Sequence, residues 1–304
     1  MKSITYKKSG VNIDVGNEVV KRIKKMVSDI GGFGGMYKYK DLIFVQSIDG
    51  VGTKMKIATK FDRWETMGHD IVAHSCNDLL CQGATPLTFL DYVASSKIDP
   101  NIVEKVIKGI VKECKANGIK LVGGETAEMP GVYEKGEYDL VGTIMGVMKK
   151  SEEITGKDIK AGDKVYGLAS LGLHTNGFSL ARKVFEKMDK KTADLLLKPH
   201  KNYWKIFNQL RKKYKIKGVA HLTGGGFLEN IPRILPKGVG VEIYKGTWPV
   251  LPIFKMIQKA GNISEQEMYR TFNMGIGLVL ISSDKLPGYE IGRVVKGQQK
   301  VILI

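Results

Sequence analysis

Short glycine-rich segments that also carry charged or hydroxyl side chains are where this chain could do chemistry. Glycine lets backbone amides approach a ligand closely, carboxylates beside it suit Mg²⁺, and Thr or Lys suit phosphate oxygens. The combination predicts an enzyme that handles nucleotide phosphates, although the G-x-x-x-x-G-K-[ST] phosphate loop does not occur in the sequence. In chain order the segments are Gly31–Gly35, Asp49–Lys54, Asn77–Asp78, Gly123–Glu128, Leu173–Gly177 and Thr223–Gly226.

Three acids in the first half are candidate metal ligands. Asp49 ends an apolar segment and opens a loop with two glycines, and Lys54 follows to neutralise phosphate charge. Asp78 lies within 68–82, an apolar segment whose polar residues recur on one helical face, and a buried carboxylate there needs a cation or donors. We predict that Asp49 and Asp78 bind one Mg²⁺, with Glu125 as a third ligand or an orienting group. The polar face comprises Asp70, His74, Asn77, Asp78 and Cys81.

These acids also allow plainer interpretations. An Asp-Gly pair is common in turns, and the polar face of 68–82 could be the solvated face of a partly exposed helix. Asp91 lies inside the apolar segment 89–93, where an acid without a partner would be costly. It either supports the site from behind or is a core acid satisfied by its neighbours, and the sequence leaves both open.

The second half offers a site for an anion. His174, Thr175 and Asn176 lie between a predicted strand and a predicted helix, with Asn176 as the natural N-cap. Amides and hydroxyls at a helix N-terminus bind anions, and a histidine with its ordinary pKa of about 6.5 could bind phosphate or move a proton. Gly225 and Gly226 repeat this geometry, although a glycine-rich turn that packs a helix against a strand is the alternative. We predict that all five residues face the substrate and that His174 is catalytic.

The other histidines and the cysteines give no sign of a site. His200 and His221 have no glycine-rich context that points to ligand binding, so a structural role is expected for both. Cys76, Cys81 and Cys114 are an odd number without C-x-x-C spacing, which indicates neither a disulfide framework nor a zinc site. The N-terminus lacks the apolar segment of a signal peptide, so a cytoplasmic, reducing location is expected.

Hydrophobic periodicity predicts an α+β chain in two domains. The polar stretch 149–163 predicts a boundary between an N-terminal domain at 1–150 and a C-terminal domain at 151–304. Strands are expected at 42–48, 87–93, 120–122, 138–148, 164–169, 218–222, 240–243 and 275–281. Helices are expected at 19–27, at 68–82 and from Pro100, which Asp99 caps.

The composition is that of a soluble globular protein. The 304 residues are 43% hydrophobic and 26% charged, and no apolar run reaches the roughly 18 residues of a membrane span. The net charge of +17 suits anionic partners, although lysines scattered over helix faces explain it equally simply. Because basic arms and nucleic-acid-binding signatures are missing, we expect a small phosphorylated substrate and neither a nucleic acid nor a membrane partner.

Taken in order, the motifs resemble those of the phosphoribosylformylglycinamidine cyclo-ligase family, also called aminoimidazole ribonucleotide synthetases. The resemblance runs from Tyr6 onward, with two departures: a short link between Asn17 and Gly31, and a trimmed end after Ser283. Neither departure removes a motif. The matching segments are Gly31–Gly35, Asp49–Lys54, Asn77–Pro86, Phe89–Tyr92, Gly123–Gly131, His174–Ser179, Ala220–Phe227, Glu229–Arg233 and Met268–Asn273.

The resemblance implies an ATP-dependent ring closure that converts formylglycinamidine ribonucleotide to aminoimidazole ribonucleotide, ADP and phosphate in purine biosynthesis. It also implies a homodimer whose N-terminal mixed sheets pair, with ATP near the interface, and a C-terminal α/β sandwich-like domain that closes the substrate cleft. The implied cofactors are ATP and Mg²⁺. The implied ATP-binding residues are Gly34, Gly35, Asp49, Gly50, Gly52, Thr53, Lys54, Asn77, Asp78 and Glu125, of which Lys54 and Asp78 are also catalytic candidates.

Related families are the nearest alternatives. A selenophosphate synthetase would need a reactive Cys or selenocysteine near the N-terminus, whereas the first cysteine here is Cys76. A thiamine-monophosphate kinase would show an Asp-Asp pair where this chain has Asp49 and Gly50. A formylglycinamidine ribonucleotide synthase usually needs a longer chain or a glutaminase partner. A nucleic-acid-binding protein would explain the charge but not the acids on glycine-rich segments.

Overall fold

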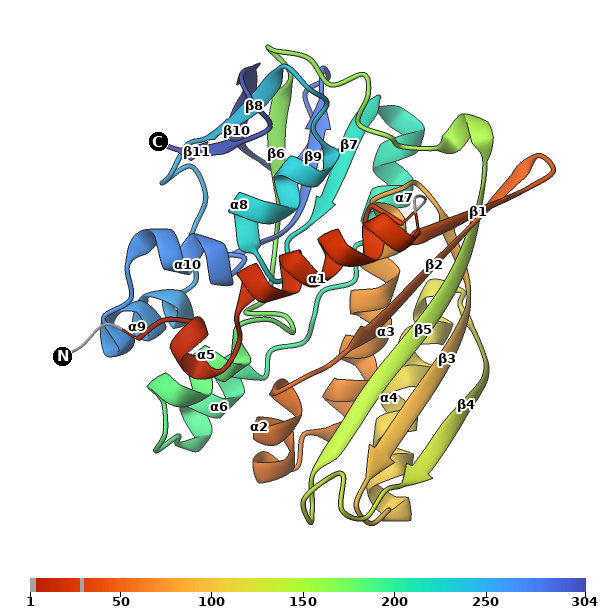
Figure 1. Ribbon diagram of the computed structural model, residues 1–304, viewed down its shortest axis with the longest axis vertical. Coiled ribbons are helices and arrows are strands. Elements are labelled where there is room, and N and C mark those ends of the chain that lie inside the picture. The colour runs from red at the N-terminus through yellow and green to blue at the C-terminus, as the bar shows by residue number, and fades with distance from the viewer. Residues whose placement is uncertain (1–3, 28–29) are drawn as a thin grey trace.

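Two β-sheets and the helices packed on them make up the protein (Figure 1). We describe residues 4–27 and 30–304 from a computed structural model. The first sheet has the strand order β1-β2-β5-β3-β4, and the second has the order β11-β8-β10-β6-β9-β7. Both sheets mix parallel and antiparallel pairs, so the predicted mixed α+β class is confirmed. In the described residues, no helix has the length and apolar character needed to span a membrane.

The first sheet holds the acidic segments. Its strand β2 runs two residues beyond the predicted end, so Asp49 lies inside the strand and not after it. Its edge strand β4 continues through Gly123–Glu128, which the sequence suggested was a loop, so Glu125 is a strand residue. The strands are β1 (Gly35–Tyr39), β2 (Leu42–Gly50), β3 (Thr85–Ser95), β4 (Lys120–Glu128) and β5 (Tyr138–Lys149).

Two long helices, α3 (Trp64–Leu80) and α4 (Pro100–Asn117), cover one face of this sheet. The Asp99 side chain accepts the N–H of Asn101 at the start of α4, as the sequence predicts for an N-cap. The two helices touch at glycines: a Cβ on Gly68 would lie 1.9 Å from a carbonyl oxygen of α4. This close approach fixes α3, which carries the polar face, against the sheet. The short helix α2 (Lys54–Phe61) precedes it.

The second half is built on the larger sheet. Its strands are β6 (Lys164–Ala169), β7 (Ile216–His221), β8 (Val239–Ile243), β9 (Ile276–Ser282), β10 (Tyr289–Lys296) and β11 (Val301–Leu303). Its helices are α5 (Phe178–Val184), α6 (Lys190–Leu196), α7 (Trp204–Lys213), α8 (Gly226–Asn230), α9 (Pro252–Gly261) and α10 (Glu265–Thr271). Single 3₁₀ turns lie at η1 (Lys7–Ser9), η2 (Lys150–Glu152) and η3 (Ile231–Ile234).

The first helix, α1 (Ile13–Met26), begins earlier than predicted and lies against the second half of the chain (Figure 1). Asp14 ion-pairs with Arg270 of α10, and the Asn17 amide lies 2.9 Å from a carboxylate oxygen of Glu229 on α8. The chain therefore passes from the second half into the first sheet between α1 and β1, and returns between β5 and β6.

Both connecting segments contact Gln82, just after the C-terminal end of α3. The Gln82 side chain donates from Nε2 to the Gly34 carbonyl at 2.8 Å, just before β1. The Gln82 carbonyl accepts the Ile154 N–H at 3.0 Å, in the stretch that leads to β6. One residue thus holds both connections between the halves.

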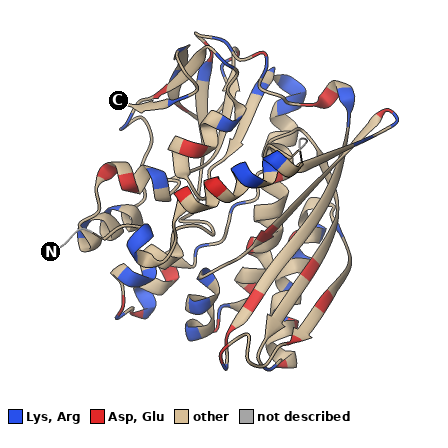
Figure 2. Cartoon of the chain, viewed as in Figure 1, with Lys and Arg blue, Asp and Glu red and all other residues tan. Residues whose placement is uncertain are grey.

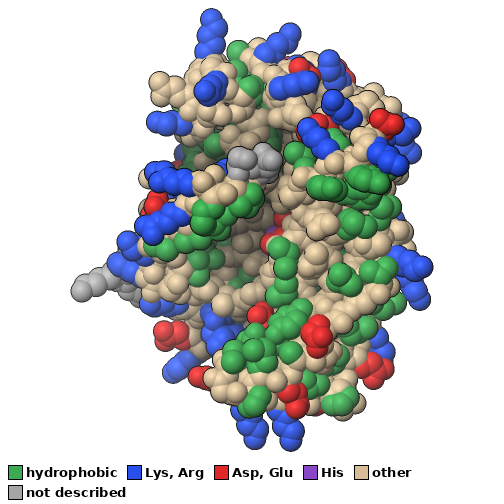
Figure 3. Space-filling model, turned by 45° about the vertical axis from the view of Figure 1, so that its right-hand side comes forward, with side chains coloured by type: hydrophobic (Ala, Val, Ile, Leu, Met, Phe, Trp, Pro, Cys, Tyr) green, Lys and Arg blue, Asp and Glu red, His purple; other side chains and the backbone are tan. Residues whose placement is uncertain are grey.

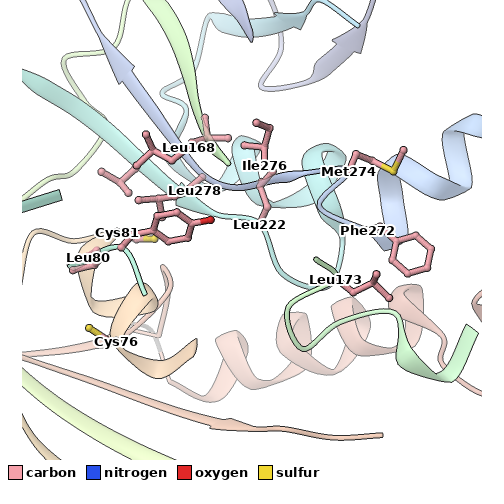
Figure 4. Close-up of a cluster of buried hydrophobic side chains, with 14 of the residues drawn as sticks. Cys76, Leu80, Cys81, Leu168, Leu173, Leu222, Phe272, Met274, Ile276 and Leu278 are labelled. Atoms are coloured by element: carbon pink, nitrogen blue, oxygen red, sulfur yellow. The ribbon is translucent and has the colours of Figure 1, made fainter. Parts of the chain in front are cut away.

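A continuous apolar core also joins the halves. Leu80 and Cys81 at the end of α3 lie near Leu168 and Leu278 of the second sheet, and all four are buried (Figure 4). Lys and Arg lie mostly on helices and loops, and the strands of the first sheet carry few of them (Figure 2). The positive charge is therefore spread over the surface and is not collected in one nucleic-acid-binding stripe.

Candidate active site

A polar cavity of about 350 Å³ lies where the two halves meet. The space-filling view shows a hollow there with acidic side chains toward its floor (Figure 3). The first half contributes residues from β2 and α3, and the second contributes the loops that precede α5 and α8. Its lining residues are Phe33, Ser47, Ile48, Asp49, His74, Asp78, Asn176, Thr223, Gly224 and Arg233.

Asp49 and Asp78 form a carboxylate pair in this cavity, as the sequence predicts. The Ser47 hydroxyl lies 3.3 Å from Asp49 Oδ2 and 3.1 Å from Asp78 Oδ2, so it bridges them. Burial raises the pKa of Asp49 to about 6, and the neighbouring carboxylate of Asp78 adds to this while His74 opposes it. Burial also raises the pKa of Asp78 to about 6. Two desolvated acids side by side gain from a shared cation or proton.

The donor set fits Mg²⁺. Across residues 4–27 and 30–304, neither Asp49 nor Asp78 ion-pairs with a Lys or an Arg, so their charge is not already neutralised. Carboxylate and hydroxyl oxygens are the ligands that Mg²⁺ prefers, and the cavity leaves room for the waters and phosphates that complete its coordination. Asp49, Asp78 and Ser47 are the residues that would hold the ion.

Four of the five histidines gather behind the carboxylate pair. His221 Nδ1 lies 2.7 Å from Asp78 Oδ1, and His74 Nε2 lies 3.4 Å from Asp49 Oδ1. His200 Nε2 lies 3.1 Å from His221 Nε2. The sequence predicted only a structural role for His200 and His221, and the fold brings both to the buried side of the acids.

The hydrogen-bond partners assign the tautomers. The Tyr203 N–H donates to Asn77 Oδ1 at 2.9 Å, so Asn77 Nδ2 faces His200 Nε2 as a donor at 3.2 Å. Burial lowers the pKa of His200 and His74, so each ring is neutral and carries one proton. His200 then carries its proton on Nδ1 and donates to Thr175 Oγ1 at 3.3 Å. Thr175 in turn donates to His74 Nδ1 at 2.9 Å, which leaves the His74 proton on Nε2, facing Asp49.

These contacts bring seven side chains into one closed set. Hydrogen bonds lead from His74 to Asp49, from Thr175 to His74, from His200 to Thr175 and from His221 to Asp78, and Ser47 joins the two acids. His200 Nε2 and His221 Nε2 face each other at 3.1 Å, and neither carries a proton. Burial lowers the pKa of His221 to about 3, so its single proton serves the shorter contact, the one to Asp78. We call this set the histidine–carboxylate ring.

The His174 side chain does not face the cavity, although the sequence predicted a catalytic residue that contacts the substrate. Its ring is fully buried and stacks on the His200 ring with centroids 4.0 Å apart and planes 18° apart. Neither ring nitrogen has a hydrogen-bond partner in the described part of the chain, and burial holds the pKa of His174 well below its ordinary value. The lone pairs of stacked rings do not converge, so His174 and His200 cannot share a metal ion at about 2.0–2.1 Å.

Lys54 also lies elsewhere than predicted. Its ammonium is fully buried, pairs with Asp70 of α3 at 2.5 Å and donates to the carbonyls of His174 and Lys198 at 2.9 Å each. It does not line the cavity with the carboxylate pair. Its charge neutralises Asp70 and ties α2 to the second half, because a buried ammonium needs an anion and acceptors.

Glu125 does not join the carboxylate pair of its own chain. In the sheet register Asp49 lies opposite Gly142, and Gly142 lies opposite Asp91. Asp91 is in turn opposite Gly124, the neighbour of Glu125, so Glu125 is three strands from Asp49, about 14 Å at the usual strand spacing. Because side chains alternate between faces, Glu125 points to the sheet face that α3 and α4 leave uncovered. The same register places Asp91 two strands from Asp49, away from the cavity lining.

The remaining residues predicted to bind ATP lie near the cavity but do not line it. Gly34 holds the loop of Phe33 against Gln82, and Gly35 begins β1. Gly50 ends β2, and Gly52 has a left-handed φ of 64° in the turn before α2. The Thr53 hydroxyl turns away from the acids to Ser179 at 3.1 Å, and Asn77 faces the histidines and the backbone at 201–203.

The predicted substrate residues divide in the same way. Asn176 lines the cavity, and its side-chain nitrogen is buried without a partner among the residues described here, so it is free to meet a ligand. The Thr175 hydroxyl belongs to the ring. Gly225 has a left-handed φ of 94°, and a Cβ on Gly226 would lie 2.1 Å from the Tyr269 carbonyl, so these two glycines allow close packing. The residues of this loop that line the cavity are Thr223 and Gly224.

Several residues in or behind the cavity were not singled out from the sequence. Ser47 lies two residues before Asp49 on one strand and therefore shares its face, a signal that strand periodicity offers. His221 ends β7 just before Thr223, which is also readable in the sequence. Arg233 stands over the Phe33 ring at 5.2 Å, a contact between residues 200 positions apart that no local pattern reports.

Comparisons with known proteins agree with this fold. The family model described as AIR synthase related protein, N-terminal domain, matches residues 34–148, and the corresponding C-terminal domain model matches residues 160–304. AaThiL complexed with AMPPCP and TMP, a solved structure, has a TM-score of 0.69 at 16% identity, covering 94% of this chain and 92% of that one. At such identity the likeness speaks for the fold alone.

Sequence relatives are much more similar. A protein of Acetivibrio thermocellus named phosphoribosylformylglycinamidine cyclo-ligase is 45% identical over 333 residues, which cover 97% of this chain and 98% of that protein. One of Geotalea daltonii with the same name is 50% identical over 308 residues, covering 93% and 88%. With such identity along nearly its whole length, the chain belongs to the phosphoribosylformylglycinamidine cyclo-ligase family.

Proposed function

We propose that the protein catalyses the ATP-dependent closure of formylglycinamidine ribonucleotide to aminoimidazole ribonucleotide. The phosphoryl group of ATP is transferred to the formyl amide oxygen, the amidine nitrogen then attacks the formyl carbon, and phosphate leaves with that oxygen as a proton is released. The identity of 45–50% with cyclo-ligases across nearly the whole chain carries this proposal. The carboxylate pair in a polar interdomain cavity agrees with it.

The chain's own residues hold and orient the reactants in this scheme. Asp49 and Asp78 hold Mg²⁺, which when bound neutralises phosphate charge. The histidine–carboxylate ring fixes the direction in which each acid presents its free oxygen. Asn176 supplies an unpaired amide donor within the cavity, and Arg233 brings a guanidinium to its lining. Positioning and electrostatics of this kind account for most of the rate in phosphoryl transfer.

A covalent mechanism through cysteine is not required. Cys76, Cys81 and Cys114 are all buried, and burial raises the pKa of the Cys114 thiol to about 12. A thiol held protonated is a poor nucleophile, since the thiolate is the reactive form. The chemistry therefore belongs to the polar cavity.

A homodimer is part of the proposal. Helices cover one face of the first sheet, and the other face is apolar and open, with Ile48 69% exposed, Val122 51% and Leu90 44%. Apolar side chains gather over this sheet in the space-filling view (Figure 3). An open apolar face of this kind suits pairing with a second copy. Glu125 lies on the same face, so any contact it makes with ATP is made at the interface and not beside its own chain's acids.

A coupled assay tests the activity. Incubation with formylglycinamidine ribonucleotide, ATP and Mg²⁺ is expected to yield aminoimidazole ribonucleotide, with one ADP and one phosphate for each ring formed. Thiamine monophosphate in place of the substrate is expected to yield no phosphorylated product. Formation of ADP with thiamine monophosphate and none with the ribonucleotide would overturn the proposal.

A further inference from the structure

The histidine–carboxylate ring crosses between the two halves of the chain. Ser47, Asp49, His74 and Asp78 come from the first half, and Thr175, His200 and His221 come from the second. The crossings are at Thr175 to His74, 2.9 Å, and at His221 to Asp78, 2.7 Å. Six of the seven members are buried. Water is therefore a poor substitute for any of these contacts, because a buried polar group without its partner costs about 1–3 kcal/mol.

In each of these two contacts, the residue from the second half is followed closely in the sequence by residues that line the cavity. Thr175 precedes Asn176, which lines the cavity and whose amide nitrogen is buried without a partner in the described part of the chain. His221 lies two residues before Thr223 and three before Gly224, both in the cavity lining. The two loops that the second half brings to the cavity are therefore tethered, each to one member of the carboxylate pair.

The donor and acceptor roles in these hydrogen bonds show that the link between Asp49 and the second half depends on Thr175. Its hydroxyl has one proton, which it donates to His74 Nδ1, and it accepts the His200 Nδ1 proton in return. Removing the hydroxyl leaves both ring nitrogens without partners and separates Asp49 from the second half. A serine at this position would keep the hydroxyl, and a valine would keep the shape without it.

We propose that this ring couples the two ligands of the site: Mg²⁺–nucleotide at Asp49 and Asp78 strengthens the binding of the ribonucleotide substrate through Thr175, His200 and His221. These three are positioning residues, since they act through the acids and through the neighbouring loops. The identity of the two ligands rests on the proposed function. The coupling itself rests on the geometry of the ring. A ligand that shifts Asp49 also shifts His74 and Thr175, and with them the adjacent Asn176.

Calorimetric titration tests the coupling. Formylglycinamidine ribonucleotide is titrated into the full-length protein with and without saturating Mg²⁺ and AMPPCP, and the ratio of the two dissociation constants is the readout. In the wild type and in Thr175→Ser we expect at least about fivefold tighter binding with nucleotide, the lower end of common coupling strengths. In Thr175→Val we expect a ratio within about twofold of one.

His69→Asn is the matched control. His69 lies on the same helix as His74 but pairs with Glu113 and, at 3.6 Å, with Asp70, both outside the ring, so its replacement is expected to leave the ratio unchanged. Should Thr175→Val fail to fold, His200→Gln removes the donor at the Nδ1 position that faces Thr175, and it is expected to lose the coupling.

The outcomes separate the inference from the proposed function. An undiminished ratio in Thr175→Val would overturn the coupling, and so would an equal loss of affinity with and without nucleotide, which would make Thr175 a direct substrate contact. A wild-type protein that binds both ligands with a ratio of one also overturns it and leaves the proposed function standing. A wild-type protein that does not bind the ribonucleotide at all refutes the proposed function.

Discussion

His221 Nδ1 lies 2.7 Å from Asp78 Oδ1, and this contact joins the end of β7 to α3 across the two halves of the chain. The histidine is neutral because burial lowers its pKa to about 3. It therefore acts as a fixed hydrogen-bond donor that takes up one oxygen of Asp78. The other oxygen accepts from Ser47 and faces the cavity. The direction of the acid is set by a residue 143 positions away.

Replacing Asp78 is expected to remove activity without unfolding the protein. Asp78→Asn keeps the size of the side chain but cannot hold Mg²⁺ as a carboxylate does, and we expect kcat to fall by about 10²–10³, as for loss of one electrostatic contact in a preorganised site. The melting temperature should change little. Steady-state kinetics and titration of Mg²⁺–AMPPCP measure the effect. The exposed Asp158→Asn serves as the control, and unchanged kinetics in Asp78→Asn would rule out the metal role.

Lys54 is expected to govern stability and not ATP affinity. Lys54→Met leaves Asp70 buried without its cation, a change that typically costs about 3–5 kcal/mol. The double variant Lys54→Met with Asp70→Leu removes both charges and is expected to regain most of that loss. Urea unfolding of the three proteins gives the comparison. If Lys54→Met has wild-type stability but a much higher KM for ATP, Lys54 binds phosphate and this prediction is wrong.

The stability contributed by His69 is expected to depend on pH. Burial lowers its pKa, but the nearby carboxylates of Asp70, at 3.6 Å, and Glu113, at 2.9 Å, outweigh this and raise the pKa to about 9. A raised histidine pKa contributes stability that is complete below the ordinary value of about 6.5 and is lost as the pH rises through 9. The melting-temperature difference between wild type and His69→Asn should therefore be large at pH 6 and small above pH 9. A difference that grows with pH would contradict the assignment.

Disrupting the open sheet face is expected to produce monomers. Ile48→Lys places a charge on the open apolar face, where a paired sheet would have to desolvate it. Sedimentation velocity at micromolar concentration should show a dimer for the wild type and a monomer for the variant. Val15→Lys, at another exposed apolar position, on α1, is the control and should stay dimeric. A wild-type protein that sediments as a monomer would remove the dimer from the proposal.

The sequence was sufficient for those parts of the site that a local pattern encodes. The helical spacing of α3 and the end of the Asp49 strand together located the carboxylate pair, because each acid lies in an element with its own periodicity. The histidine–carboxylate ring could not be foreseen, since its members range from Ser47 to His221 and only tertiary packing brings them together. Lys54 was misplaced for a related reason: a lysine beside glycines has the same sequence context whether it faces phosphate or a buried carboxylate. The division into domains at residue 150 stays a prediction.

The contacts of Gln82 have a consequence for how the halves can move. The chain crosses between them twice, and both crossings are held by this one residue, through the Gly34 carbonyl and the Ile154 N–H. Because both connections are anchored at the same place, a rotation that separates the halves has its hinge axis close to the end of α3. Asp78 lies on the last turn of that helix, near the axis, whereas α2, which contacts α5, directly precedes its first turn. Opening the protein to admit a ligand would then part the α2–α5 end widely while the carboxylate pair keeps its spacing.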